Sequence, residues 1–257
     1  MTPQGIDNGG IVGEIFSSFQ GEGPLVGRRQ IFVRTAGCNL RCIYCDTPRF
    51  RSRLDICRVE DRAGSGRFRQ VENPLSPEIV MDLILRLRSP GLHSVSITGG
   101  EPLCQPEFVE ALAIGCRAAG LPVYLETNGF SSTRFSRLID WIDFAAVDLK
   151  LPSHQASSPE GRNELVENEL TCLKTASRFG VFTIAKAVIL NSTVPAELES
   201  IYPRLEGLDI FMVIQPASGE HRPDPKKLMR LHEAASMYLD PEKVMVLPQV
   251  HRMMDIL

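Results

Sequence analysis

Cys38-Asn39-Leu40-Arg41-Cys42-Ile43-Tyr44-Cys45-Asp46-Thr47 is the stretch from which the fold of this chain can be worked out. It places three thiols at spacings of four and three residues, directly after the strand-like segment Gln30–Arg34. Thiolates are soft ligands that favour zinc or iron–sulfur clusters. A four-iron cluster normally takes four thiolates, so three would leave one iron open to another molecule. A structural zinc site would instead need a fourth ligand elsewhere, such as Cys57 or a histidine.

Two glycine-containing loops accompany the cysteines. Gly99-Gly100-Glu101-Pro102 follows the predicted strand Ser94–Thr98, and its glycines allow backbone groups to approach a bound molecule closely. Gln20-Gly21-Glu22-Gly23-Pro24 ends the apolar segment Ile11–Phe19, and taken alone it indicates a turn. Both loops therefore stand where a ligand could lie against the main chain.

The cysteine spacing followed by Gly-Gly-Glu-Pro resembles the radical S-adenosylmethionine (SAM) superfamily. Further stretches are similar to the 7-carboxy-7-deazaguanine synthases of that superfamily, and together they span nearly the whole chain: Glu14–Phe16, Phe19–Gly23, Phe32–Arg34, Ala36–Cys42, Cys45–Thr47, Glu126–Gly129, Gln215-Pro216 and Leu247–His251. The resemblance implies a lyase that contracts the ring of 6-carboxy-5,6,7,8-tetrahydropterin to give 7-carboxy-7-deazaguanine with loss of ammonia. That product belongs to queuosine or archaeosine biosynthesis.

The resemblance also implies three cofactors and a set of site residues. Cys38, Cys42 and Cys45 would hold a [4Fe-4S] cluster, and Thr47 would bind Mg²⁺. The residues implied for S-adenosylmethionine are Tyr44, Cys45, Asp46, Gly100, Glu101, Glu126, Asn128, Asp148, Leu149, Lys150, Gln215, Pro216, Ala217 and Ser218. Those implied for the pterin are Phe19, Gln20, Gly21, Glu22, Arg34, Thr98 and His251. No further catalytic side chain is implied, because a radical made from the cofactor performs the chemistry. Many relatives carry Ser-Pro-Lys where this chain has Asp148-Leu149-Lys150, which makes the contact of Asp148 an open point.

The order of strands and helices predicts an α/β fold. Strand-like segments recur at Gln30–Arg34, Ser94–Thr98, Val123–Glu126, Phe144–Val147, Val181–Leu190, Ile210–Ile214 and Val244–Leu247. Helices are expected from Ser76 to about Arg88 and over Pro106–Ala119, Ser158–Gly180 and Pro225–Tyr238. Polar clusters follow the strand ends, as in parallel sheets with one functional rim. We therefore expect a partial (β/α)₆ barrel of the radical SAM type, forming one domain over residues 1–257.

The segment from about 48 to 74 has no clear periodicity, and we expect an irregular insertion there. Seven arginines fall between positions 49 and 69, against only Asp55, Glu60 and Asp61. A solvated face is the simpler interpretation of this charge. A docking surface for an acidic electron donor is the more specific one.

Composition limits the partners and the cellular compartment that we expect for this protein. The formal charge is −3 and the pI near 6.0, so no global field favours nucleic acid or an anionic membrane. No apolar run reaches the ~20 residues needed to span a bilayer, and Met1–Gly10 does not resemble a signal peptide. Seven cysteines, an odd number, fit a reducing compartment better than a disulfide framework. We expect a cytoplasmic protein in which Cys57 is not a ligand and Cys104, Cys116 and Cys172 are core thiols.

Two alternative functions stay open at this level. A glycyl-radical-enzyme activase shares the thiol spacing and the glycine loop, but it would have no need of a magnesium–pterin pocket around Gln20–Gly23. A non-enzymatic, zinc-stabilised binding module would use the cysteines only to brace a loop. The preferred enzyme would need an external electron donor such as flavodoxin or ferredoxin and no nucleic-acid groove, and its relatives suggest a homodimer.

Overall fold

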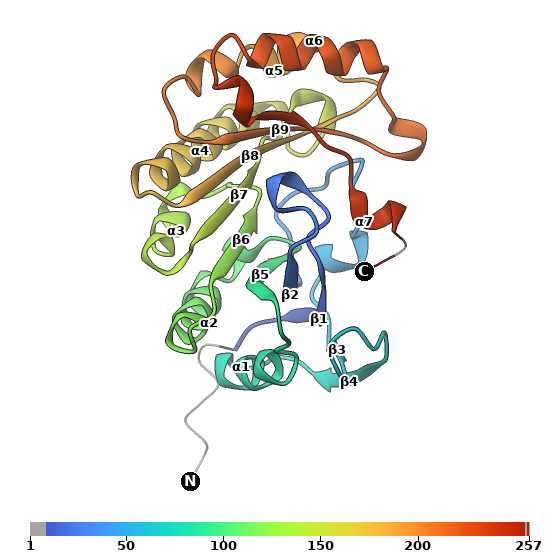
Figure 1. Cartoon of the computed structure of the whole chain (residues 1–257), viewed down its shortest axis with the longest axis vertical. Coiled ribbons are helices and arrows are strands. Elements are labelled where there is room, and N and C mark those ends of the chain that lie inside the picture. The colour runs from blue at the N-terminus through green and yellow to red at the C-terminus, as the bar shows by residue number, and fades with distance from the viewer. Residues whose placement is uncertain (1–8, 255, 257) are drawn as a thin grey trace.

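One mixed sheet of ten strands organises residues 9–254 and 256, the part of the chain that the computed structural model describes. The strand order is β10-β9-β8-β7-β6-β5-β2-β1-β3-β4, and the sheet curves into an open half-barrel (Figure 1). The strands are β1 (Val12–Phe19), β2 (Arg29–Thr35), β3 (Ile56–Glu60), β4 (Phe68–Glu72), β5 (Leu92–Gly99), β6 (Val123–Thr127), β7 (Phe144–Asp148), β8 (Phe182–Ile189), β9 (Phe211–Pro216) and β10 (Val244–Val246). Residues 1–8, where we expect a loose start, lie outside the described residues.

Strands β2 and β5 to β10 are all parallel. The helices are α1 (Pro77–Arg86), α2 (Pro106–Ala118), α3 (Ser132–Ser136), α4 (Pro159–Arg178), α5 (Pro195–Glu199), α6 (Pro225–Ala235) and α7 (Val250–Met253). Helices α1 to α6 lie on the outer face of the sheet: one follows each of the strands β5 to β9, and α1 stands between the β3–β4 hairpin and β5 (Figure 1). This arrangement confirms the predicted partial (β/α)₆ barrel. None of the described helices is long and apolar enough to cross a membrane.

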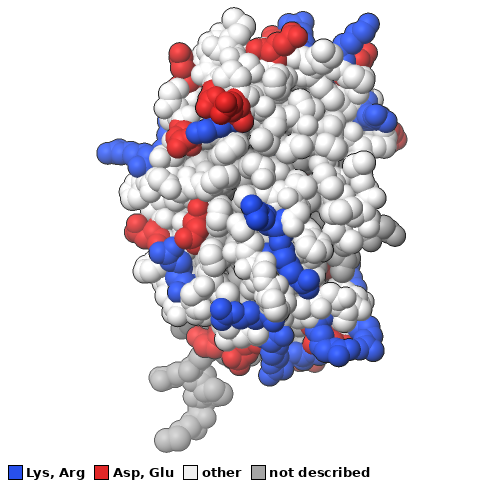
Figure 2. Space-filling view, in the orientation of Figure 1, with Lys and Arg blue, Asp and Glu red and all other residues white. Residues whose placement is uncertain are grey.

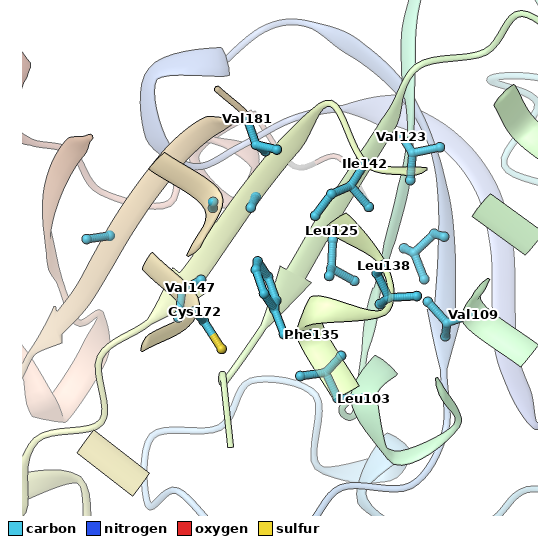
Figure 3. Packing of buried hydrophobic residues seen from close by; sticks show 14 of the residues in the cluster. Leu103, Val109, Val123, Leu125, Phe135, Leu138, Ile142, Val147, Cys172 and Val181 are labelled. Atoms are coloured by element: carbon cyan, nitrogen blue, oxygen red, sulfur yellow. The ribbon is translucent and has the colours of Figure 1, made fainter. Parts of the chain in front are cut away.

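The main hydrophobic core lies between the outer face of the sheet and the helices. Leu125 and Val147 of the strands pack with Phe135 and Leu138 from the α3 region, and Cys172 of α4 points into the same cluster (Figure 3). Cys57, Cys116 and Cys172 are fully buried, which confirms that they are core thiols rather than ligands. Cys104 differs from expectation, because it is only half-buried and interacts electrostatically with Cys38.

The inner face of the half-barrel is polar, because side chains alternate between the two faces of each strand. In β5, Val95 and Ile97 face the core, whereas Ser96 and Thr98 face inward. Strand pairing then sets inward residues side by side. The register opposes Glu14 to Arg34, and Arg34 to Thr98. A row of polar side chains is thus built across strands that are distant in the sequence.

The expectation of an irregular segment over residues 48–74 is wrong. Strands β3 and β4 form an antiparallel hairpin there, and β3 pairs with β1 at the edge of the sheet. Alternation explains the strand, since Cys57 and Val59 face the core while Arg58 lies beside Glu14 on the opposite, inward face of the sheet. The high charge of the segment concealed this five-residue pattern.

Candidate functional site

The three cysteines line one cavity of about 400 Å³ at the carboxyl ends of the strands. All three thiols are free and half-buried. The loop that carries them follows β2 and is held by main-chain bonds from Gly37 N to Phe50 O (2.8 Å) and from Cys38 N to Arg51 O (3.1 Å). Arg51 also donates to the carbonyl of Cys42 at 2.5 Å. The thiols are therefore presented by a braced loop.

Three thiols on one loop are the donor set that a four-iron cluster with one open iron would use. The Leu40 amide donates to Cys38 Sγ at 3.4 Å, a bond that would stabilise a thiolate. Burial raises the pKa of Cys38, against the lowering effect of this hydrogen bond. Within residues 9–254 and 256, no three Cys, His, Asp or Glu side chains are grouped so that they could hold a single metal ion. A cluster presents separate irons to its ligands, so its thiolates need not converge.

The Gly-Gly-Glu-Pro loop packs directly against the start of the cysteine loop. Gly100 N donates to Thr35 O at 2.9 Å, and Glu101 N donates to Gly37 O at 2.8 Å. A Cβ on Gly100 would lie 2.2 Å from Gly37 O, and Gly99 has a φ of +116°. The glycines are therefore required for docking the two loops together, as well as for leaving the backbone accessible.

The side chain of Glu101 holds neighbouring loops together through hydrogen bonds. Its carboxylate accepts from Thr127 Oγ1 at 2.6 Å and from the amides of Asn128 (2.7 Å) and Leu103 (2.9 Å). Burial raises the pKa of Glu101 to about 7, although these three hydrogen bonds favour the ionised form. Contact between Glu101 and a cofactor would therefore involve its backbone.

Inside the cavity, Glu126 joins residues expected to bind the pterin. It accepts from Gln20 Nε2 and from Thr98 Oγ1, each at 2.9 Å. Asn128, expected like Glu126 to bind S-adenosylmethionine, donates from Nδ2 to Asn39 Oδ1 at 2.9 Å. Burial raises the pKa of Glu126, against the lowering effect of Lys186. The structure therefore groups Glu126 with the predicted substrate residues.

A buried charge network crosses the cavity wall. Asp148 accepts from Lys150 Nζ at 2.8 Å and from Lys186 Nζ at 3.1 Å, and Lys186 also pairs with Glu22. Lys150 reaches Tyr44 Oη of the cysteine loop at 3.2 Å. Burial lowers the pKa of Lys186, but the carboxylates of Asp148 and Glu22 outweigh that effect and raise it well above the usual value. Both lysines are thus held as cations.

A second, smaller cavity of about 130 Å³ adjoins the first. It is lined by the predicted segment Gln215–Ser218, and it shares with the larger cavity Glu22, Tyr44, Asp46, Asp148, Lys186 and Arg252. Gln215 is 3% exposed, and its Oε1 has no hydrogen-bond partner among the described residues. An unpaired buried acceptor on a residue that lines this cavity would suit a ligand that carries N–H groups.

Most predicted site residues line these two cavities. The exception is Leu149, whose side chain lies in the main core because alternation along the chain directs it away from Asp148 and Lys150. Arg34 lines the larger cavity, but its Nε is paired with the buried Glu14 at 2.9 Å. The lining residues of the larger cavity that are absent from the predicted site are Phe32, Leu40, Arg51, Gly99, Thr127, Lys186, Arg252 and Ile256, and the smaller cavity adds Val188, His221 and Gln249.

Residues near the carboxyl end fasten two walls of the cavity together. Val250 N donates to Gly21 O at 2.8 Å, and Gln249 Nε2 donates to Glu22 Oε1 (2.7 Å) and Asp46 Oδ2 (2.9 Å). The ring of His251 lies against Gly21, where an added Cβ would approach it within 2.1 Å. Figure 1 shows α7 beside the barrel opening. We call residues 249–253 the clasp.

Replacing Gln249 by alanine should loosen the clasp. Two hydrogen bonds to carboxylates would be lost, each contributing about 1.5–3 kcal/mol. Because both oxygens belong to cavity residues, we expect the KM of the substrate to rise about tenfold with a smaller change in kcat. Steady-state kinetics measure this, with the exposed Gln70→Ala as control. Equal KM values for the two variants would contradict a role for the clasp.

The pH dependence of stability should report the pairing of Asp148. Burial raises its pKa, but Lys150 and Lys186 outweigh that effect and lower it to about 2. Since this lies below the ordinary value near 3.9, the pairing stabilises the fold above about pH 4 and is lost as the pH falls toward 2. Asp148→Asn should cost about 2 kcal/mol at neutral pH and about half as much near pH 3. Urea unfolding across this range, with the exposed Asp82→Asn as control, tests the change.

Comparison with known proteins identifies the class. A model of the Radical SAM superfamily matches residues 32–203, which include the cysteine loop and most of the barrel. The fold and the site therefore define a radical SAM protein. A 7-carboxy-7-deazaguanine synthase of Methanothermobacter thermautotrophicus is 36% identical over 93% of this chain and 94% of its own. One of Geobacter sulfurreducens is 36% identical over 94% and 95%. The chain belongs to the 7-carboxy-7-deazaguanine synthase family.

Solved structures agree on the fold. QueE from Escherichia coli is 17% identical, with a TM-score of 0.59 over 98% of this chain and 100% of its own. A radical SAM methyltransferase from Sphaerobacter thermophilus is 16% identical, with a TM-score of 0.60 over 86% of this chain and 66% of its own. These likenesses confirm the partial barrel and concern the fold alone.

Proposed function

We propose that this chain contracts the ring of 6-carboxy-5,6,7,8-tetrahydropterin to give 7-carboxy-7-deazaguanine with loss of ammonia. The observation that carries the proposal is one cavity that contains the three thiols, the glycine loop and the inward polar row of Gln20, Thr98 and Glu126. Family membership supports the reaction type. A cluster with bound S-adenosylmethionine supplies the radical chemistry, and the protein's part is to bind, orient and exclude water.

The inward polar row has the chemistry to orient a pterin. The pyrimidine ring of such a substrate offers neighbouring N–H groups and a carbonyl oxygen. The Glu126 carboxylate would accept from the N–H groups, and the amide of Gln20 would donate or accept beside it. Thr98, bonded to Glu126 at 2.9 Å, fixes the direction of that carboxylate. Lys186 holds a proton at Nζ near the same wall and stabilises negative charge there.

Magnesium and the substrate carboxylate belong to the rim of the cavity. The Thr47 hydroxyl lines the cavity beside Cys45, 3.9 Å from its sulfur, and would supply one oxygen ligand to Mg²⁺. Arg34 would meet the substrate carboxylate with the part of its guanidinium that Glu14 does not engage. Gln215 would accept from the base of S-adenosylmethionine in the smaller cavity. The electron would come from an external donor.

The activase alternative fits the cavity less well. The clasp ties Gly21, Glu22 and Asp46 together across the opening, which suits a small molecule better than a polypeptide loop.

A reconstitution assay tests the function. Anaerobically loaded protein supplied with reductant, Mg²⁺ and S-adenosylmethionine should convert the carboxytetrahydropterin to the deazaguanine, detected by mass spectrometry. Omission of Mg²⁺ should slow turnover if Thr47 holds the ion. Cleavage of S-adenosylmethionine without that product would reject the substrate, and a colourless protein containing one zinc would reject the cluster.

A further inference from the structure

A chain of neutral polar side chains runs through the barrel interior from the larger cavity. Charged side chains lie over the molecular surface that Figure 2 shows, whereas Gln20, Gln30 and Ser94 are uncharged and at most 2% exposed. Buried polar groups must find their hydrogen-bond partners within the protein, because an unpaired one costs free energy. The partners of these three side chains therefore determine what Gln20, the member that lines the cavity, can offer a ligand.

Three hydrogen bonds hold the Gln20 amide at the cavity end of the chain. Its Oε1 accepts from the main-chain amide of Glu22 at 3.0 Å, and its Nε2 donates to Gln30 Oε1 (3.0 Å) and to Glu126 Oε1 (2.9 Å). A main-chain amide can only donate, so the Glu22 N–H identifies the oxygen of Gln20. Both hydrogens on Nε2 then have acceptors. The second lone pair of Oε1 is what the Gln20 side chain has left for a ligand.

Gln30 continues the chain with the same polarity. Its Oε1 accepts from Gln20, so its Nε2 is the end that donates to Ser94 Oγ, at 2.9 Å. The Ser94 hydroxyl can then donate to His93 Nδ1, which lies 3.0 Å away. Burial and the charge of Arg28 lower the pKa of His93, so its ring is neutral and can accept. Every hydrogen bond in the chain therefore runs in the same direction.

Reversal of the Gln20 amide would break this pattern. It would place Nε2 against the main-chain N–H of Glu22, and Oε1 against the Glu126 carboxylate, and each such pair leaves a buried group without a partner. The Thr98 hydroxyl donates to Glu126 Oε2 at 2.9 Å, so its hydrogen is also used. Ionised Glu126 has no hydrogen to donate. The inward polar row of Gln20, Thr98 and Glu126 thus presents acceptors to the cavity.

We propose that Gln30 and Ser94 are positioning residues that make Gln20 a hydrogen-bond acceptor toward the substrate. The proposal rests on the proposed function and deepens it, because it says which ring edge the cavity selects. Acceptors favour a heterocycle with neighbouring N–H donors, such as the aminopyrimidine edge of a pterin, and disfavour one with a carbonyl oxygen at the same place. Gln30 and Ser94 do not line either cavity, so they act through Gln20.

The test compares two serines of β5. Ser94→Ala removes the hydroxyl that accepts from Gln30, whereas Ser96→Ala removes a hydroxyl that is equally buried and has no hydrogen-bond partner among the described residues. Gln30→Met removes the acceptor for Gln20 with little change in volume, and Gln30→Glu keeps an oxygen at that place. Thermal unfolding shows whether each variant folds. If Gln30→Met does not fold, the two serine variants decide the outcome.

Two inert ring systems serve as probes of the cavity. They are 6-carboxypterin and 6-carboxylumazine, in which a carbonyl oxygen replaces the 2-amino group. Isothermal titration calorimetry measures the Kd of each probe for anaerobically loaded protein with S-adenosylmethionine and Mg²⁺, without reductant. We expect unmodified protein and Ser96→Ala to prefer carboxypterin by about a hundredfold or more, because the lumazine carbonyl would face an acceptor.

The preference for carboxypterin should fall about tenfold in Ser94→Ala and Gln30→Met, because the Gln20 amide is then free to turn, and Gln30→Glu should largely restore it. An unchanged preference in Ser94→Ala, or an equal fall in Ser96→Ala, would overturn the proposal. A preference in Gln30→Glu as low as that in Gln30→Met would also overturn it, since both changes would then act through packing alone.

Hydrogen exchange of Gln20 tests the chain without a ligand. In protein labelled with ¹⁵N at glutamine, NMR should show slow exchange of both Gln20 side-chain hydrogens in unmodified protein and Ser96→Ala, and about tenfold faster exchange in Ser94→Ala and Gln30→Met. Equal exchange in all four proteins would overturn the proposal. Binding of neither probe to unmodified protein, with no deazaguanine in the reconstitution assay, would reject the proposed function instead, and the exchange rates would then decide whether the chain fixes Gln20.

Discussion

Cys42→Ala should give a protein that retains neither cluster nor turnover. Among the described residues, three thiols line the cavity, and Cys42 is one of them. The two thiolates that remain in the variant are too few to hold a four-iron cluster. We expect the iron content and the visible absorbance of the reconstituted variant to fall to background, together with cleavage of S-adenosylmethionine. Iron analysis and absorbance after anaerobic reconstitution measure the result.

Cys172→Ala provides the matched control. Its thiol is fully buried in the core between β7 and α4, so its loss should cost about 1 kcal/mol of stability and leave the cluster intact (Figure 3). Loss of the cluster in the Cys172 variant, or its retention in the Cys42 variant, would show that other thiols bind the iron.

Lys186→Met should have the largest effect among residues outside the cysteine loop. The change leaves Glu22 without its cation and Asp148 with only Lys150, in a place where Lys186 is 11% exposed. Breaking a buried ion pair in this way costs about 3 kcal/mol or more. We also expect turnover to fall about a hundredfold, because Glu22 and the loop around it would shift against the substrate. Urea unfolding and the reconstitution assay measure the two effects.

The stability loss has an internal test. If it arises from uncompensated carboxylates, Asp148→Asn combined with Lys186→Met should be less destabilising than the sum of the single changes, with a coupling of about 1–3 kcal/mol. The exposed Lys174→Met is the control for loss of a lysine. Additive effects would show that Lys186 acts through packing of its alkyl chain instead.

The sequence carried enough information to predict the barrel and most cavity residues. Parallel strands with polar residues at their carboxyl ends must bring those residues to one rim, so Cys38, Gly100, Glu126 and Lys150 were expected together from strand order and family resemblance. The structure places all four in one cavity. Leu149 was included in the predicted site because it lies between Asp148 and Lys150. The alternation of side chains along a strand would have assigned it to the core.

Other features could not be predicted because their partners are remote in the sequence. Lys186 interrupts an apolar strand, which suggests that its side chain faces the barrel interior. The neighbouring sequence does not indicate that Glu22 and Asp148 are its partners. Gln249 likewise meets Glu22 and Asp46 across more than two hundred positions. The β3–β4 hairpin was missed for a local reason, since five-residue strands rich in arginine resemble a solvated loop. The segment forms a hairpin because β3 pairs with β1 at the edge of the sheet.

The contact between Gly21 and Val250 also bears on the order in which the site is made. During synthesis the three cysteines leave the ribosome about two hundred residues before the clasp, at roughly 5–20 residues per second. For that interval the half-barrel has no fastened wall on this side. The clasp can therefore close over this side of the cavity only after the cysteine loop and the barrel strands have been synthesised.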